Sequence, residues 1–197
     1  MNRTFESIFA FTASVLLLPL FIVIALWIMI DSGGGILYRQ SRVGKDNSDF
    51  MIYKFRSMHR NADALGLITT GHSDKRVTGA GRFLRKYKLD ELPQLFNILK
   101  GDMSIVGPRP EVRKYVELYT PEQMRVLSVR PGLTDYASLD YINEGELLSQ
   151  ADDPEGFYVR EIMPAKLRLN LKYIDEKSPG LNLKIIGRTI GKIFAGN

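Results

Sequence analysis

Residues 8–30, IFAFTASVLLLPLFIVIALWIMI, form an uninterrupted apolar segment of 23 residues without a charged side chain. A helix rises roughly 1.5 Å per residue, so this length covers a bilayer core of about 30 Å. We therefore predict a membrane helix. A cleaved signal peptide is the competing reading, but its apolar region would be shorter, and no small-residue cleavage site precedes Asp31.

Pro19 lies at the centre of this apolar segment. Proline removes a backbone hydrogen bond and kinks a helix, so two topologies follow: a kinked span, or a re-entrant hairpin that returns to the same membrane face. Arg39, Arg42 and Lys45 favour the cytoplasmic side for the residues that follow, and Arg3 favours the same side for the amino terminus. Charge alone therefore leaves both topologies open.

The residues after the apolar segment predict one compact α+β unit that is predominantly helical. Residues 36–44 and 50–58 alternate apolar and polar side chains and predict a β-hairpin, with 45–49 as its turn. Residues 61–81 are polar and glycine-rich and predict a long loop. Residues 82–101 predict two short amphipathic helices, with Pro93 in the first turn of the second.

The carboxyl-terminal part predicts further helices. Residues 102–112 read as a turn-rich connector, 121–133 as a helix that stops near Arg130, and 164–194 as two helices separated by 178–180. In the last helix, apolar residues recur at helical spacing beside a basic stripe. The apolar set is Leu183, Ile186, Ile190 and Ile193, and the basic set is Lys184, Arg188 and Lys192. Such a helix fits either an anionic membrane surface or a protein core.

Composition and charge limit the kinds of metal site and of partner that the chain can have. The chain has no cysteine, and its two histidines, His59 and His72, lie in polar surroundings, so any metal would be a hard cation held by oxygen atoms. Residues 39–88 hold twelve Lys or Arg against four Asp or Glu, whereas 140–161 holds seven acids and one base. A basic half of this kind favours phosphate-bearing partners, in nucleic acid, at a lipid surface or in a nucleotide.

Two acids, Asp90 and Glu91, interrupt the basic half just before Pro93. Acids in a first helical turn are common complements of the helix dipole, which also keeps a carboxylate ionised. An ionised aspartate can alternatively act as a metal ligand, general base or nucleophile. Attack on a phosphoryl group would need nearby cations. The candidates are Lys54, Arg56, Arg82, Arg85, Arg109 and Arg130.

Three blocks behind the apolar segment carry a resemblance. YKFRSM (53–58), LDELPQLFNILKGDMSIVGPRP (89–110) and RPGLT (130–134) resemble the bacterial sugar transferase family, the small monotopic polyprenyl-phosphate phosphoglycosyl transferases. The resemblance implies transfer of a sugar 1-phosphate from a UDP-sugar to polyprenyl (undecaprenyl) phosphate, with release of UMP and with Mg²⁺ as cofactor. It also implies the first membrane step of glycoconjugate assembly, at the cytoplasmic face of the bacterial inner membrane.

The resemblance also implies roles for individual residues. Asp90 matches the nucleophile that forms a covalent phosphosugar intermediate, and Glu91 matches the second acid, which we assign with Asp90 to metal coordination. The expected phosphate- and substrate-binding residues are Arg56, Arg85, Gln94, Arg109 and Arg130. The implied architecture is a re-entrant anchor over 1–31, broken at Pro19, and a catalytic domain over 32–197.

The chain departs from the family pattern at three places. Leu18 replaces the serine usual before the proline, Lys88 replaces a capping serine, and DYASLDYINEGELL (135–148) replaces a run that ends in arginine. The last change suggests a subgroup with its own specificity, and it leaves the role of 135–160, the sugar, the pathway and the oligomeric state open. Two rival functions also remain: a membrane-tethered nucleic-acid-binding protein, although no known binding motif is present, and a membrane phosphohydrolase.

Overall fold

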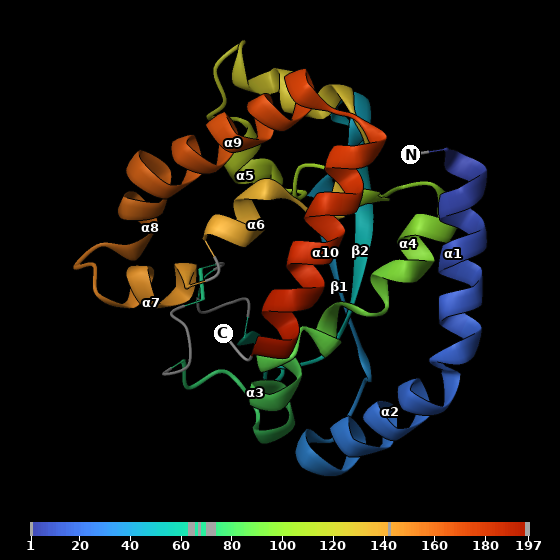
Figure 1. Ribbon diagram of the computed structural model, residues 1–197. Helices are drawn as coiled ribbons and strands as arrows, with labels where there is room; N and C mark the ends of the chain where they lie inside the picture. The colour runs from blue at the N-terminus through green and yellow to red at the C-terminus, as the bar shows by residue number, and fades with distance from the viewer. Residues whose placement is uncertain (1, 63–65, 67, 70–73, 142, 196–197) are drawn as a thin grey trace.

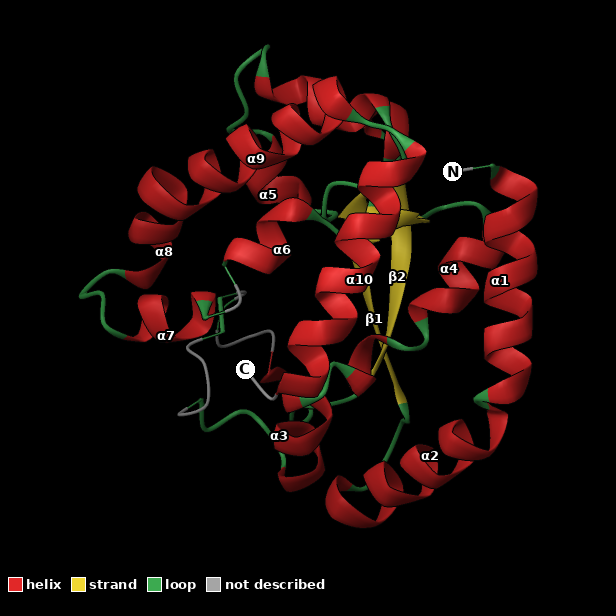
Figure 2. Cartoon of the chain, in the orientation of Figure 1, coloured by secondary structure: helices red, strands yellow, loops and turns green. Residues whose placement is uncertain are grey.

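The protein is predominantly helical with two small sheets, which confirms the predicted α+β class (Figures 1 and 2). The computed structural model describes residues 2–62, 66, 68–69, 74–141 and 143–195. The helices are α1 (Arg3–Leu16), α2 (Leu18–Ser32), α3 (Gly79–Lys86), α4 (Gln94–Lys100), α5 (Arg113–Val116), α6 (Tyr136–Asp140), α7 (Glu144–Ser149), α8 (Pro154–Phe157), α9 (Met163–Glu176) and α10 (Pro179–Ala195). The strands are β1 (Leu37–Val43), β2 (Asp49–Phe55), β3 (Ser104–Val106) and β4 (Gly132–Thr134), and shorter helical turns are η1 (Lys45–Asn47), η4 (Leu89–Glu91), η5 (Gln123–Ser128) and η6 (Tyr158–Ile162).

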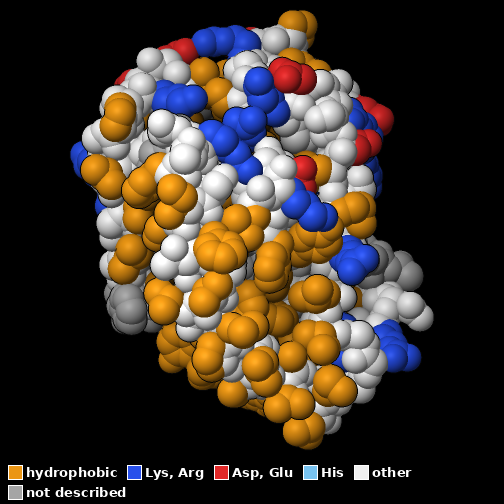
Figure 3. All heavy atoms as spheres, turned by 90° about the vertical axis from the view of Figure 1, so that its right-hand side faces the viewer, with side chains coloured by type: hydrophobic (Ala, Val, Ile, Leu, Met, Phe, Trp, Pro, Cys, Tyr) orange, Lys and Arg blue, Asp and Glu red, His pale blue; other side chains and the backbone are white. Residues whose placement is uncertain are grey.

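The apolar segment is a bent helix pair. α1 and α2 meet at Leu17 with a bend of 60°, and Pro19 is the second residue of α2, so the predicted break is confirmed. Among the described residues no single helix has both the length and the apolar character to cross a membrane, whereas this pair meets both criteria together. Its large side chains form a broad apolar surface on one side of the molecule (Figure 3).

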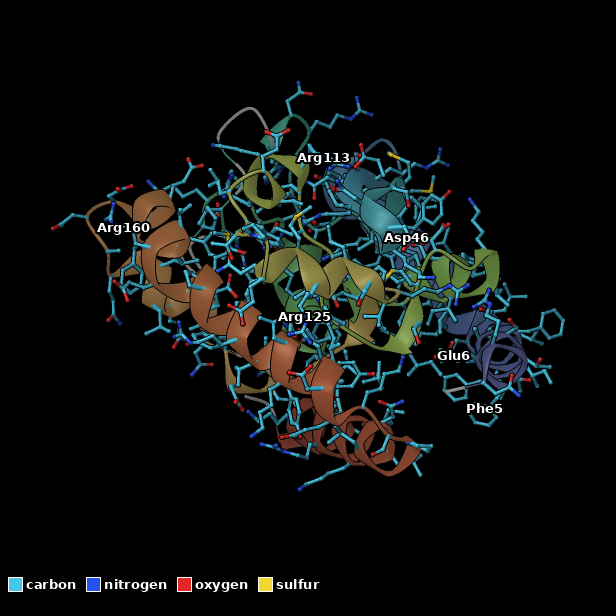
Figure 4. The ribbon with its side chains drawn as sticks, turned by 90° about the horizontal axis from the view of Figure 1, so that it is seen from above. Phe5, Glu6, Asp46, Arg113, Arg125 and Arg160 are labelled. Atoms are coloured by element: carbon cyan, nitrogen blue, oxygen red, sulfur yellow. The ribbon has the colours of Figure 1, made fainter. Side chains whose placement is uncertain are left out.

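Both ends of the helix pair contact the rest of the protein. At the start of α1, Arg3 donates to the carbonyl oxygen of Leu99 at 3.0 Å. One turn later, Glu6 is buried and lies on the side of α1 that faces the other helices (Figure 4). At the end of α2, Arg56 donates to the hydroxyl of Ser32 at 2.9 Å. Both ends of the pair are therefore fixed to the folded unit, and between them Ala10, Ile24 and Ile28 are buried in its core.

Glu6 is expected to hold α1 in place. Its carboxylate accepts hydrogen bonds from the hydroxyl of Ser104 and from the backbone N–H of Ile105, both in β3. Glu6→Ala would leave that buried N–H without a partner, at a cost of about 1–3 kcal/mol of unfolding free energy. Thermal denaturation in detergent should show a lower midpoint for Glu6→Ala than for the wild type. Glu117→Ala, at an exposed position, should leave the midpoint unchanged, and equal midpoints for the two variants would contradict the role of Glu6.

The predicted hairpin is confirmed, with Leu37 opposite Phe55 and Val43 opposite Asp49. The predicted loop over 61–81 is partly wrong, because 79–81 form the first turn of α3. That turn starts there because the hydroxyl of Thr78 caps the helix by accepting from the N–H of Gly81 at 2.9 Å. His72 and seven other positions of this loop region lie outside the described residues, so the prediction is tested only at the remaining positions.

A second sheet was not predicted. β3 lies within the expected connector and pairs in parallel with β4, which falls in RPGLT, so that Ser104 lies opposite Gly132 and Val106 opposite Thr134. The approach is close: a Cβ atom on Gly132 would lie 2.1 Å from the backbone nitrogen of Gly107. Glycine is therefore required at 132. Strands of three residues are too short to produce a recognisable alternation in the sequence.

The last helix packs into the core. Ile185 of α10 is fully buried in a cluster with Tyr173 of α9 and Ile105 of β3, which confirms the core-packing alternative for this side of α10. The predicted apolar stripe is offset from the buried side, since Leu183 and Ile190 are exposed. Whether that outer side contacts lipid stays a prediction.

Candidate active site

Asp90 and Glu91 lie in η4, a separate 3₁₀ turn, and not in the first turn of the next helix. α4 begins at Gln94, with Pro93 as its N-cap. The backbone N–H groups of Glu91 and Leu92 are already bonded to the carbonyls of Lys88 and Leu89. The expectation that free N–H groups of a helix start would hold the two carboxylates was therefore wrong. Lys88, in the left-handed conformation at φ 56°, separates α3 from this turn.

Glu91 is held by two cations. Both of its carboxylate oxygens accept from the guanidinium of Arg109, with Nη1 and Oε2 3.2 Å apart, and the ammonium of Lys54 lies 3.1 Å from Oε1. Arg109 is the largest favourable influence and, with Lys54, it holds the pKa of Glu91 well below its usual range despite burial. Glu91 is therefore an ionised, oriented carboxylate.

Asp90 is in a different state. Its side chain is buried, and burial followed by the neighbouring charge of Glu91 raises its pKa, while Lys54 and Arg85 oppose that rise. Its Oδ1 atom is buried without a hydrogen-bond partner among the described residues. A buried carboxylate oxygen without a partner is costly in free energy and is typical of a functional group. The predicted ionisation of Asp90 by a helix dipole is thus not supported by its surroundings.

Several predicted cations meet beside Asp90. A large pocket with a volume of ≈ 1320 Å³ is lined by Asp90, Glu91, Arg56, Arg85 and Arg109. Arg85 is positioned by a hydrogen bond from its Nε to the hydroxyl of Ser57 at 2.9 Å. Arg56 reaches the pocket from the end of β2 while it contacts Ser32 of the bent helix pair. The pocket therefore adjoins the end of the bent helix pair.

Lys54 also lines this pocket, and sequence reasoning treats it only as one of six candidate cations. Burial is the main influence on its ammonium group and lowers its pKa, while Glu91 raises it. Lys54 belongs to the YKFRSM block, together with Arg56, and this is the sequence feature by which it could have been found. The structure places its ammonium beside Glu91, which also contacts Arg109.

The small sheet holds Arg109 in place. Arg109 follows β3, and its backbone N–H donates to the carboxylate of Asp135 at 3.3 Å, directly after β4. Asp135 is fully buried and also caps α6 by accepting from the N–H of Ser138 at 2.7 Å. The pairing of β3 with β4 therefore brings the loop that bears Arg109 opposite the turn that bears Glu91.

The amide side chains of Gln94 and Asn97, both in α4, have different surroundings. Gln94 is buried beside the acid-bearing turn, and neither polar atom of its side chain has a partner among the described residues. The amide of Asn97 instead joins α4 to β2: it donates to the carbonyl of Met51 at 2.7 Å and accepts from the N–H of Tyr53 at 3.0 Å. Asn97 therefore has a structural role.

Arg130 is not brought to this pocket. Its Nε donates to the carbonyl of Gly101 at the end of α4, 2.9 Å away, and the residue lines a separate, smaller cavity. Arg130 is therefore separated from the other phosphate-binding candidates, and its own phosphate-binding role stays a prediction. Arg130 precedes β4 and Asp135 follows it, so the β3–β4 pairing places these two residues at opposite ends of the strand.

The far end of the large pocket is rich in tyrosine, a feature that sequence reasoning missed. Tyr115, Tyr119, Tyr141 and Tyr158 line it, together with Asn170 of α9, whose buried Oδ1 has no partner among the described residues. Glu111 anchors this end by accepting hydrogen bonds from Tyr158 and from Arg42. These residues are scattered over about a third of the chain, so no local pattern marks them.

The sequence model for the family described as "Bacterial sugar transferase" matches residues 1–196. The chain belongs to the bacterial sugar transferase family. The resemblance carried by the three sequence blocks is thus confirmed. The match includes α1 and α2, so the bent helix pair is part of the family's sequence and not an unrelated leader.

Three curated relatives of this sugar transferase cover almost the whole chain. It is 37% identical over 100% of its length to a protein of Aeromonas hydrophila named UDP-N-acetylgalactosamine-undecaprenyl-phosphate N-acetylgalactosaminephosphotransferase. It is 38% identical over 96% of its length to the undecaprenyl-phosphate glucose phosphotransferase of Komagataeibacter xylinus. It is 35% identical over 98% of its length to the UDP-glucose:undecaprenyl-phosphate glucose-1-phosphate transferase of Caulobacter vibrioides. The chain spans 44%, 36% and 69% of these proteins, respectively.

The acid-bearing turn offers two carboxylates as possible metal ligands. Among the described residues no group of three or more His, Asp or Glu side chains could enclose a metal by itself. Mg²⁺ is commonly held by one or two carboxylates together with substrate phosphates. The free Oδ1 of Asp90, with Glu91 beside it, fits that need for hard oxygen ligands.

Proposed function

We propose that this sugar transferase moves a sugar 1-phosphate from a UDP-sugar to undecaprenyl phosphate and releases UMP. The observation that carries the proposal is the buried Asp90 carboxylate, with one free oxygen, in a large pocket lined by Lys54, Arg85 and Arg109. The names of the three relatives support the substrate classes. The match to a sugar transferase family gives no support to the nucleic-acid-binding alternative.

The proposed reaction has two displacement steps. An oxygen of Asp90 attacks the sugar-bearing phosphorus of the donor, and the bond from that phosphorus to the bridging oxygen breaks, so that UMP leaves with the electron pair. An oxygen of undecaprenyl phosphate then attacks the same phosphorus. The second step frees the Asp90 carboxylate and yields undecaprenyl diphosphate sugar. Each step exchanges one P–O bond for another, so no oxidant or reductant is needed.

The surrounding residues supply orientation and charge. Arg109 and Lys54 hold Glu91 in one orientation next to Asp90. Arg85, which is fixed by Ser57, presents positive charge to the donor phosphates. Asp90 and Glu91 would hold Mg²⁺, which favours the ionised carboxylate and neutralises phosphate charge when bound.

The bent helix pair is proposed to enter the cytoplasmic leaflet of the bacterial inner membrane as a re-entrant anchor. Both of its ends contact the folded unit, through Arg3 and Glu6 at one end and Ser32 at the other. A straight span would have to break one of these sets of contacts. A polyprenyl phosphate keeps its phosphate at headgroup depth, and Arg56 links the anchor to the pocket at the same place.

The tyrosine-rich end of the pocket is proposed to receive the nucleoside and sugar of the donor. Tyr141, Asn143, Glu144 and Tyr158 belong to the acidic segment that departs from the family pattern, and all four line the pocket. Aromatic rings offer stacking surfaces, and the amide and carboxylate offer hydrogen bonds to hydroxyl groups. The relatives' names include both glucose and N-acetylgalactosamine, so family membership alone does not specify the sugar.

Intact-mass spectrometry with a panel of UDP-sugars, Mg²⁺ and no lipid acceptor tests the proposal. The expected result is a protein adduct with the mass of a sugar phosphate, absent in Asp90→Asn. An unmodified wild-type protein that still turns over with acceptor would refute the two-step route. Radiolabelled sugar in the lipid phase supports a transferase, whereas label released only into water would support a phosphohydrolase.

Chelation is expected to stop turnover. With EDTA, UMP release should fall to background, because the metal ion proposed at Asp90 and Glu91 supplies charge neutralisation that phosphoryl transfer requires. Added Mg²⁺ in excess of the chelator should restore the rate. Full turnover in EDTA would contradict the assignment of Asp90 and Glu91 as metal ligands.

A further inference from the structure

A second basic cavity lies apart from the proposed active site. Its volume is ≈ 190 Å³, and four cationic side chains line it, from Arg3, Lys45, Arg130 and Lys177, with Glu6 as the acid among them. None of its lining residues lines the large pocket that contains Asp90. The cavity therefore gives Arg130, which the active site does not use, a different environment.

Positive charge in this cavity exceeds what its own residues balance. The carboxylate of Glu6 is already occupied by the hydroxyl of Ser104 and the N–H of Ile105. Lys45 contacts Asp46 at 3.5 Å, but Asp46 is largely exposed. Four cations placed together repel one another, and an anion between them would relieve that repulsion.

One guanidinium nitrogen of a residue that lines the cavity lacks a hydrogen-bond partner. Nη1 of Arg3 is buried and has no hydrogen-bond partner among the described residues. A guanidinium nitrogen without water or an acceptor costs more than a neutral group would, so such atoms are normally paired. An oxygen of a phosphate group would complete its bonding, because guanidinium and phosphate match in geometry and charge.

A purely structural role explains only part of this arrangement. Nη2 of Arg3 and Nε of Arg130 donate to the carbonyls of Leu99 and Gly101, so both residues cap the end of α4. Each cap uses one nitrogen of the guanidinium and leaves others for a ligand. Lys45 and Lys177 take no part in the cap, yet they line the same cavity.

We propose that this basic cavity binds a phosphate group. The ligand is a phosphate group, either the phosphodiester or phosphomonoester of a lipid headgroup or a free phosphate ion. The position favours contact with a membrane surface: Phe5, two residues after Arg3, is 56% exposed and begins the apolar surface of α1. On that side of the molecule, Lys and Arg side chains gather above the apolar area (Figure 3).

The test compares two double variants that remove the same charge. Arg130→Gln/Lys177→Gln alters the cavity, and Arg168→Gln/Lys172→Gln removes two exposed cations of α9 that do not line it. The thermal midpoint is measured with inorganic phosphate or with chloride at matched ionic strength. It is also measured in nanodiscs of phosphatidylcholine, with and without phosphatidylglycerol. Phosphate bound at the active site affects both variants equally, so the difference between them reports the cavity.

The α9 control should gain about 2–4 °C more from saturating phosphate than the cavity variant. If the cavity variant also loses the stabilisation by phosphatidylglycerol, the source of the phosphate is a lipid headgroup. If it loses only the stabilisation by inorganic phosphate, the ligand is a soluble phosphate. Equal responses of the two variants to both ligands would overturn the proposal. If Arg130→Gln unfolds α4, Lys45→Gln/Lys177→Gln leaves the cap intact and provides the same comparison.

Discussion

Asp90→Asn is expected to reduce sugar phosphate transfer by at least about 10³-fold, because the amide removes the nucleophilic oxygen while keeping the shape of the side chain. Stability should change in the opposite direction. Burial and Glu91 raise the pKa of Asp90, so the folded protein disfavours the charged form, and a neutral amide relieves that cost. The thermal midpoint of Asp90→Asn at neutral pH should therefore be higher than that of the wild type.

The measurements are UMP release in a coupled assay and thermal denaturation in the same detergent. Asp152→Asn, which changes an exposed acid outside the large pocket, serves as the matched control and should keep wild-type values for both. Wild-type turnover by Asp90→Asn would remove the proposed mechanism. A lower midpoint would show that Lys54 and Arg85 stabilise the carboxylate more than burial destabilises it.

Arg109→Lys should be the second most damaging change, with a loss of about 10²-fold in kcat/KM. Both oxygens of Glu91 accept from the guanidinium, and a lysine ammonium cannot make this two-pronged contact. Glu91 would keep only Lys54 as a close cation, and its pKa would rise from the low value that Arg109 maintains. The Glu91 side chain would then turn away from Asp90 or take up a proton.

Steady-state kinetics with a UDP-sugar and a polyprenyl phosphate provide the measurement. Arg113→Lys is the control, because Arg113 makes an exposed ion pair with Asp49 away from the pocket, and its loss should change kcat/KM by less than about twofold. A role for Arg109 confined to folding predicts a lower thermal midpoint with normal kinetics in the folded fraction. That outcome would contradict the role assigned to the Arg109–Glu91 contact.

Several features of the fold follow from local sequence patterns. The apolar segment with a central proline predicts a broken helix, and Pro19 is the second residue of α2 after a 60° bend. Alternation predicts the β1–β2 hairpin, and helical spacing predicts α3, α4, α9 and α10. These elements are determined by neighbours in the chain, so a pattern of ten to twenty residues is sufficient to identify them.

The sequence by itself determined the family, the broken apolar helix pair, the hairpin and the acidic pair, because each depends on residues that are adjacent or one helical turn apart. The tertiary structure decided which cations meet that pair. It brought both Arg109 and Lys54 into contact with Glu91, and it placed Arg130 in a separate cavity. It also buried Asp90 and reversed the expected direction of its pKa shift. Charge interactions and desolvation depend on distances between segments that are far apart in the chain, and a linear pattern does not contain those distances.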